Sequence, residues 1–200
     1  MGIKMYHLKV NNHKNIFYIN DRLKSEELQL TLLFFFLACI IGWLWEVVFI
    51  WINNGILVNR GILHGPWLPI YGCGGILMVI LKKSIGHKPF YFIAGSIVSS
   101  GLLEYITSWL LETIFHARWW DYSNQPFNLQ GRICIKYLIF FAVVGSIAVF
   151  VVKPLFDKLL LYFPTKIRKY LCIGLSIMFL IDLVYSFLFP DIGVGISTLI

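Results

Sequence analysis

The sequence has few charged residues. Lys, Arg, Asp and Glu make up 14% of its 200 residues, whereas hydrophobic residues make up 58%. About a quarter of the residues of a typical soluble domain are charged, and a soluble core of this size cannot bury so much apolar surface. With a mean hydropathy of +0.77, the shortage of charge excludes an ordinary soluble domain and indicates a protein that lies largely in a lipid bilayer.

Common catalytic and nucleotide-binding motifs are also missing. The sequence contains no HExxH, no GxSxG and no GxxxxGK[ST] phosphate loop, so an ATP-driven activity would need its ATPase from another chain. The four cysteines form no CxxC pair and have no metal-type spacing. We interpret them as packing residues, and a bridge between Cys73 and Cys134 stays open. We expect neither a metal nor a cofactor.

The net charge of +7 could suggest nucleic acid, but the basic residues lie between the apolar runs. Five Lys or Arg lie in 1–27, three in 82–88 and five in 153–169, against three on the other side of the predicted membrane. Loops rich in Lys and Arg stay in the cytoplasm. The pattern therefore predicts an inside N-terminus, an outside C-terminus and no nucleic-acid partner.

The apolar runs predict an all-α, polytopic membrane helix bundle in the cell membrane. A polar, basic segment (1–27) would precede the bundle (28–190), and a short tail (191–200) would follow it. We expect about five transmembrane helices, because runs of about 20 apolar residues cross a bilayer. The expected spans are 28–52, 66–81, 89–115, 134–152 and 170–189.

The second of these runs is irregular. Pro66 and Pro69 are followed by Gly72, Gly74 and Gly75, and these residue types disfavour a straight helix. We therefore expect a bent or re-entrant start to this span. Non-helical backbone at membrane depth survives only where protein or water satisfies it, so this start should line a cavity or pack inside the bundle.

Four carboxylates fall inside predicted spans: Glu46, Glu104, Glu112 and Asp182. A charge at the centre of a span costs at least ~2.5–3.5 kcal/mol on insertion scales. Glu104, Ser108 and Glu112 follow one another at intervals of four residues, so they form one polar stripe along a helix. Such residues normally face the protein interior and mark a pathway or a partner.

In the predicted orientation Glu46 and Glu112 lie toward the outer ends of their spans. The two outer loops carry Arg60, His64, His116, Arg118, Asp121 and Arg132, and Trp119 and Trp120 flank two of these charges. We therefore expect a polar site near the outer face. The alternative is structural, because membrane bundles also use buried ion pairs to stabilise packing. Neither reading is excluded by the sequence.

The same two loops resemble a known family. NRGILHGPWLPIYGCG (Asn59 to Gly74) is similar to its N-R-G-x-L-x-G-P-x-x-P-I-Y-G-x-G stretch. LEYITSWLLETIFHARWWDYSNQPFNLQGRIC (Leu103 to Cys134) resembles its second hallmark, with E-Y, a later L-E, then W-D-Y-S, F-N and G-R-I. The family comprises bacterial membrane proteins catalogued as "Putative ABC-transporter type IV" permeases, so the resemblance implies a part in transport.

Three arguments together give the candidate residues: the cost of placing polar side chains in a membrane, their predicted depth in the bundle, and the family resemblance. Candidates for binding a substrate or ion are Glu46, Arg60, His64, Tyr71, Glu104, Ser108, Glu112, Trp120, Asp121, Tyr122, Asn128, Arg132 and Asp182. Candidates for shaping the backbone are Gly65, Pro66, Pro69, Gly72 and Gly131. No catalytic residue and no metal ligand is assigned.

Three functions remain open. We favour a permease-like transport component with an outward-facing polar pocket. It would lie among membrane lipids and associate with a separate ATPase, a permease subunit or further copies of itself. The first alternative is a membrane enzyme or binding protein that acts on a lipid or lipid-linked substrate at the outer leaflet. The second is a structural or regulatory subunit of a membrane complex.

Overall fold

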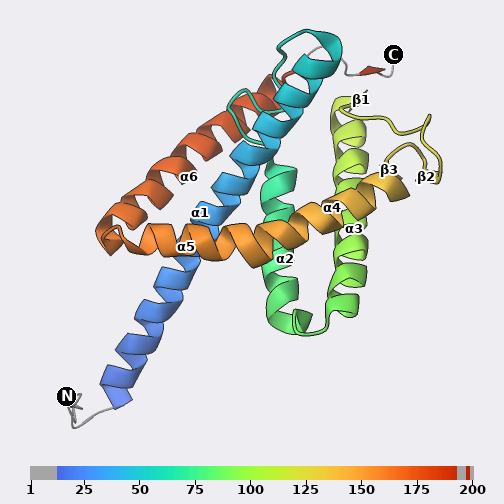
Figure 1. Cartoon of the computed structure of the whole chain (residues 1–200). Helices are drawn as coiled ribbons and strands as arrows, with labels where there is room; N and C mark the ends of the chain where they lie inside the picture. The colour runs from blue at the N-terminus through green and yellow to red at the C-terminus, as the bar shows by residue number, and fades with distance from the viewer. Residues whose placement is uncertain (1–12, 193–196, 199–200) are drawn as a thin grey trace.

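The computed structural model of the chain describes residues 13–192 and 197–198 and is an all-α helix bundle, as predicted (Figure 1). The helices are α1 (His13–Asn54), α2 (Pro69–Ile85), α3 (Pro89–Phe115), α4 (Ile135–Ile147), the π-helical turn η1 (Ala148–Val152), α5 (Lys153–Leu161) and α6 (Thr165–Leu188). Two short antiparallel pairs join β1 (Ala117–Arg118) to β4 (Ser197–Thr198) and β2 (Asn128–Leu129) to β3 (Ile133–Cys134).

Four helical segments are long and apolar enough to cross a membrane: Leu23–Asn54, Pro89–Phe115, Ile135–Leu161 and Thr165–Leu188. At 17 residues, α2 is shorter than these, so the number of five spans and their orientation stay predictions. Of the expected polar segment 1–27, residues 1–12 lie outside the described residues. The remainder is already helical and belongs to α1.

The bundle has two ends, which differ in the segments that they carry. The loop end carries the non-helical segments 55–68 and 116–134, and the turn end carries the tight turns at 86–88 and 162–164. In Figure 1 the loop end lies toward the top, where α1, α3 and α6 end close to these segments.

Segment 55–68 turns back from the end of α1 and descends along that helix. Its last residue, Leu68, donates its backbone N–H to the carbonyl of Cys39 at 3.1 Å. About 22 Å of helix separates Cys39 from Asn54, at ~1.5 Å per residue. The segment is therefore re-entrant, and α2 begins deep in the bundle with Pro69 in its first turn.

Segment 116–134 also folds back, a feature that the sequence did not predict. Tyr105, about 15 Å below the end of α3 at ~1.5 Å per residue, donates from its hydroxyl to Gln130 Oε1 at 2.7 Å. Arg132 Nη1 donates to Ser108 Oγ at 3.3 Å. Both family-like stretches thus return into the bundle from the same end.

The fourth span is longer than expected. The helix does not stop near Val152 but continues through η1 and α5 to Leu161, so the first part of the expected connector 153–169 is helical. A π-helix pairs each N–H with the carbonyl five residues earlier, which would pair residue 154 with Val149. Pro154 has no N–H, and Lys82 Nζ donates to the Val149 carbonyl instead, at 3.0 Å.

Small residues let α2 lie directly against α1. A side chain at Gly72 would overlap Cys39 Sγ and the Phe35 ring. Below this contact, Phe34 of α1 and Met78 of α2 form a buried core with residues of α3 and η1. The bundle core therefore holds α2 and its re-entrant start in place.

Candidate functional site

Asp182 on α6 binds the re-entrant segment 55–68. Its carboxylate accepts the backbone N–H of His64 at 3.2 Å, that of Gly65 at 2.9 Å and the indole N–H of Trp67 at 2.7 Å. Ser186 donates its hydroxyl to the same carboxylate at 3.1 Å. Four donors thus occupy this acid, which fits a role in holding the loop.

Two of the candidate residues near Asp182 belong to this contact. His64 Nδ1 lies 2.9 Å from Ser186 Oγ, and its ring lies edge-on to Tyr185 at 5.0 Å between centroids. A Cβ at Gly65 would come 2.8 Å from Asp182 Oδ2, so only glycine allows this approach.

Among the residues that the structure describes, no cluster of three or more metal-ligating side chains occurs.

A second group joins the first loop to α1. Arg60 Nε donates to Glu46 Oε2 at 3.1 Å, and the Tyr71 hydroxyl donates to Glu46 Oε1 at 3.0 Å. Arg60 also donates from Nη2 to the carbonyl of Trp119 at 3.4 Å. The two re-entrant segments therefore touch each other through Arg60.

A third group lies between α3 and the second loop. Arg118 binds Glu112 with two parallel hydrogen bonds of 3.0 Å, which raise the pKa of the guanidinium. Arg132 Nη1 lies 2.6 Å from Glu112 Oε2, and its guanidinium lies 5.8 Å from the centre of the Tyr105 ring. Bidentate Arg–carboxylate pairs are among the strongest side-chain hydrogen bonds, so this group secures the loop to α3.

Glu104 is different, because one of its oxygens has no partner. Tyr122 donates its hydroxyl to Oε1 at 2.9 Å, whereas Oε2 is buried without a hydrogen bond. Burial and the nearby Glu104 carboxylate raise the pKa of the Tyr122 phenol, with weaker contributions from Tyr71 and Glu46. Tyr122 therefore stays protonated, and the Glu46 and Glu104 groups are electrostatic neighbours.

The remaining candidates of the second loop bond mainly within that loop. Asp121 accepts from the backbone N–H and the hydroxyl of Ser123, which lowers the pKa of its carboxyl. Asn128 accepts the N–H of Gly131 at 3.0 Å. Trp120 donates its indole N–H to the carbonyl of Arg132 at 2.9 Å. These contacts shape the loop rather than leave side chains free for a ligand.

Three buried polar atoms of α3 and the second loop have no hydrogen-bond partner. Among the described residues, Glu104 Oε2, Arg132 Nε and Trp119 Nε1 are buried without a partner, and all three residues are at most 8% exposed. They comprise one acceptor and two donors. Buried polar groups normally have partners, so each of these atoms is open to a water or to a polar group of a ligand.

Asn59 was missed by the sequence reasoning, whereas Arg118 and Trp119 were noted in the second outer loop but not included among the binding candidates. Asn59 accepts from Trp43 at 2.6 Å and donates to Asp191 at 2.7 Å, which ties the first loop to both α1 and the segment after α6. Its place at the head of the N-R-G stretch was an available signal. The roles of Arg118 and Trp119 depend on how the second loop folds back.

Comparison with known proteins gives one family. No curated protein and no solved structure has significant similarity to the chain. The family described as "Putative ABC-transporter type IV" matches residues 33–187, which include α2, α3, both re-entrant segments and most of the other helices. The chain therefore belongs to this family.

Proposed function

We propose that the chain is a membrane component of a transporter, and that its loop end binds a small polar solute or an ion from the outside. The family is described as a type of ABC transporter, and four helices are long and apolar enough to cross a membrane. The geometry of the loop end supports a polar binding site at Glu104.

The side of the membrane follows from the basic residues. The turns and the N-terminal part carry far more Lys and Arg than the loops, and such segments stay in the cytoplasm. With the turn end inside, both re-entrant segments open toward the outside. A solute arriving from that side would meet the arginines of the loops before it met Glu104.

The observation that carries the proposal is the unpartnered Oε2 of Glu104. A carboxylate within an apolar helix is costly, and a purely structural acid would be expected to have both oxygens paired, as Asp182 does. The unpaired oxygen can accept a hydrogen bond from a solute, or bind a cation.

Transport also needs an energy source and a path. The sequence has no phosphate loop for ATP, so in an ATP-driven system a separate ATPase subunit would associate with this chain. A second permease subunit or further copies of the chain would complete the path. Membership in an ABC-transporter family supports such association with other subunits.

The test is affinity purification in mild detergent, followed by mass spectrometry of the proteins, small molecules and lipids that come with the chain. Glu104→Gln keeps the size of the side chain and removes its charge, and Glu27→Gln at the turn end is the matched control. We expect an ATPase or permease subunit with all three proteins, and a small polar solute with wild type and Glu27→Gln only.

A specific observation favours the alternative of a lipid or lipid-linked substrate. An apolar groove of about 380 Å³ runs along α3 and α4 at Gly101 and Leu138, and its lining includes Tyr105 of α3 and Leu129 and Ile133 of the second loop. An acyl chain in this groove would place its head group near Arg132. A specific lipid that is lost from Glu104→Gln, without any copurifying subunit, would replace the transport proposal by this one.

A further inference from the structure

A second polar region lies at the opposite end of the bundle. A groove of about 560 Å³ runs between α1, α2 and α5 at the turn end. Its charged lining consists of Lys82, Lys83, Lys153, Glu26, Glu27 and Asp157. This groove is separate from the loop end and from the function proposed for it.

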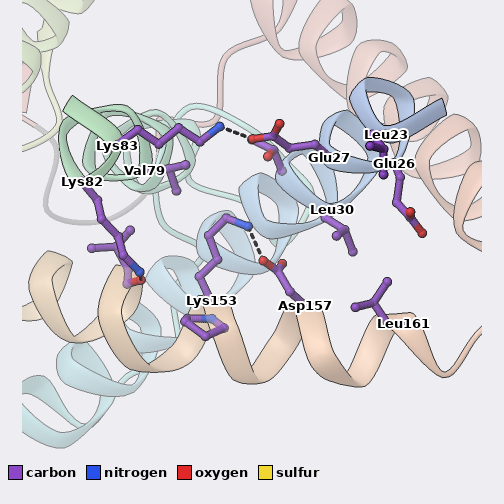
Figure 2. A pocket seen from close by; sticks show the side chains of 13 residues that line it. Leu23, Glu26, Glu27, Leu30, Val79, Lys82, Lys83, Lys153, Asp157 and Leu161 are labelled. Atoms are coloured by element: carbon purple, nitrogen blue, oxygen red, sulfur yellow. Dashed lines mark hydrogen bonds and ion pairs between the residues drawn. The ribbon is translucent and has the colours of Figure 1, made fainter. Parts of the chain in front are cut away.

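Figure 2 shows how these side chains lie. Lys83 points across the groove to Glu27, with which it forms an ion pair, and Lys153 Nζ lies 2.6 Å from Asp157 Oδ2. Lys82 has no such partner: among the side chains that the structure describes, no carboxylate lies within ion-pair distance of it. It donates to the carbonyl of Val149 at 3.0 Å and lies 4.8 Å from the centre of the Phe150 ring, so its positive charge has no carboxylate partner among these side chains.

The groove also holds an unused acceptor. Asp157 Oδ2 binds Lys153, but Asp157 Oδ1 is buried without a hydrogen-bond partner. The groove therefore offers a cation without a carboxylate at Lys82 and an acceptor without a donor at Asp157. A ligand that satisfies both must carry a negative group and, a short distance away, a hydrogen-bond donor.

The surroundings suit a lipid. The groove wall includes apolar side chains of α1 and α5, and its rim residues Leu23 and Leu161 are 59% and 55% exposed. Lys82 and Lys83 form the last turn of α2, where the chain leaves the bundle. Basic pockets between helices on the cytoplasmic side are known binding places for lipid head groups.

We propose that this groove binds a membrane phospholipid through a phosphoethanolamine head group. The phosphate contacts Lys82, the primary ammonium donates to Asp157 Oδ1, and the acyl chains extend past Lys82 toward the apolar lining at Leu30 and Val79. This proposal is independent of the function proposed for the loop end.

The experiment compares two lipids with identical acyl chains, phosphatidylethanolamine and phosphatidylcholine. They differ in that choline has no N–H to donate. The delipidated full chain is titrated with each lipid in detergent, and bound lipid is counted by native mass spectrometry. We expect wild type to prefer phosphatidylethanolamine by about five-fold, the ratio that one hydrogen bond of about 1 kcal/mol gives.

Three variants test the two contacts. Asp157→Asn should reduce the preference for phosphatidylethanolamine, and a variant that has merely lost its fold would lose both lipids equally. Lys82→Gln should weaken both lipids by about five-fold, since each Lys near a lipid phosphate contributes about that factor. Lys158→Gln removes an exposed charge from the same helix as Asp157. It should change neither the preference for phosphatidylethanolamine nor the affinity for either lipid.

Four results would contradict the binding of a phosphoethanolamine lipid in this groove. Equal binding of the two lipids by wild type, or an unchanged preference in Asp157→Asn, would exclude the ammonium contact and the proposal with it. Equal effects of Lys82→Gln and Lys158→Gln would indicate general attraction to the membrane surface. Competition by soluble phosphoethanolamine at the same concentration as the lipid would show that a free phosphate ester, and not a lipid, is the ligand.

Discussion

Two carboxylates at the loop end differ in how many hydrogen bonds they accept. Asp182 accepts from four donors and holds the first re-entrant segment against α6. Glu104 accepts from Tyr122 alone and keeps Oε2 free. Residues of the same chemical type thus have different roles, and the number of partners separates the structural acid from the candidate ligand-binding acid.

Asp182→Asn should destabilise the protein. The amide keeps one acceptor oxygen and turns an NH₂ group toward donors, so at least one buried N–H loses its partner. A hydrogen bond to a charged group contributes about 1.5–3 kcal/mol, and we expect a loss of about that size, seen as a lower thermal unfolding temperature in detergent. An unchanged unfolding temperature would show that Asp182 does not hold the loop.

Asp121 gives a prediction about pH. The Ser123 hydrogen bonds and Arg118 lower the pKa of its carboxyl in the folded protein. Its contribution to stability is therefore fully present above the unfolded pKa of about 3.9, and it is lost as the pH falls through the lower, folded pKa. Because this side chain is 45% exposed, we expect less than about 1 kcal/mol.

The measurement is the unfolding temperature of wild type and Asp121→Asn between pH 3 and pH 7. The difference between the two proteins should be constant above about pH 4 and should shrink below it. A difference that grows as the pH falls would show that the ionised carboxylate of Asp121 does not stabilise the folded protein.

At the scale of elements, the approach of α2 to α1 depends on glycine. Gly72→Ala would bring a methyl group into Cys39 Sγ and the Phe35 ring, whereas Gly174→Ala on α6 meets nothing within 4 Å. We expect Gly72→Ala to cost about 1–3 kcal/mol through overpacking. Gly174→Ala should be neutral or stabilise by up to about 1 kcal/mol, since Ala is the better helix former.

Thermal unfolding of the two variants side by side measures this difference. If Gly72→Ala unfolds at the temperature of wild type, α2 has room to move away from α1, and the re-entrant start is not held by this contact. Gly174→Ala reports any general effect of adding a methyl group to a helix of this bundle.

The helix from α4 to α5 shows why a proline need not end a span. Pro154 has no N–H that could donate to the Val149 carbonyl in the π-helical pattern, and Lys82 of α2 donates to that carbonyl instead. The sequence prediction ended the span near Val152 and placed a partly amphipathic, basic connector after it. In the structure the helix continues to Leu161.

For the whole molecule, the predicted orientation can be tested with two single cysteines in a background without the native ones. Asn124→Cys lies in the second loop, and His87→Cys lies in the turn between α2 and α3; both positions are exposed. With an inside N-terminus, a membrane-impermeant maleimide should label Asn124→Cys in intact cells. It should label His87→Cys only after permeabilisation.

Labelling of both cysteines from the same side would mean that α3 does not cross the membrane. Labelling of His87→Cys alone in intact cells would reverse the orientation and place the cluster around Glu104 on the cytoplasmic side. In that case the proposed outward-facing pocket would be wrong, whatever the family.

Composition and hydropathy by themselves determined the class of the molecule. The scarcity of charge and the long apolar runs require a helix bundle in a bilayer, because backbone groups in lipid must be satisfied within a helix. Pro66 and Pro69 likewise marked the irregular start of the second span. These features are local, so one stretch of sequence is enough to predict them.

Only the tertiary structure decided which polar residues meet. The Tyr122 contact to Glu104, the four donors around Asp182 and the Arg132 contact to Ser108 join residues from different elements. The fold-back of segment 116–134 along α3 has no counterpart in its composition. Hydrogen-bond partners far apart in the chain depend on how helices pack, and the spacing of residues along one helix does not contain that information.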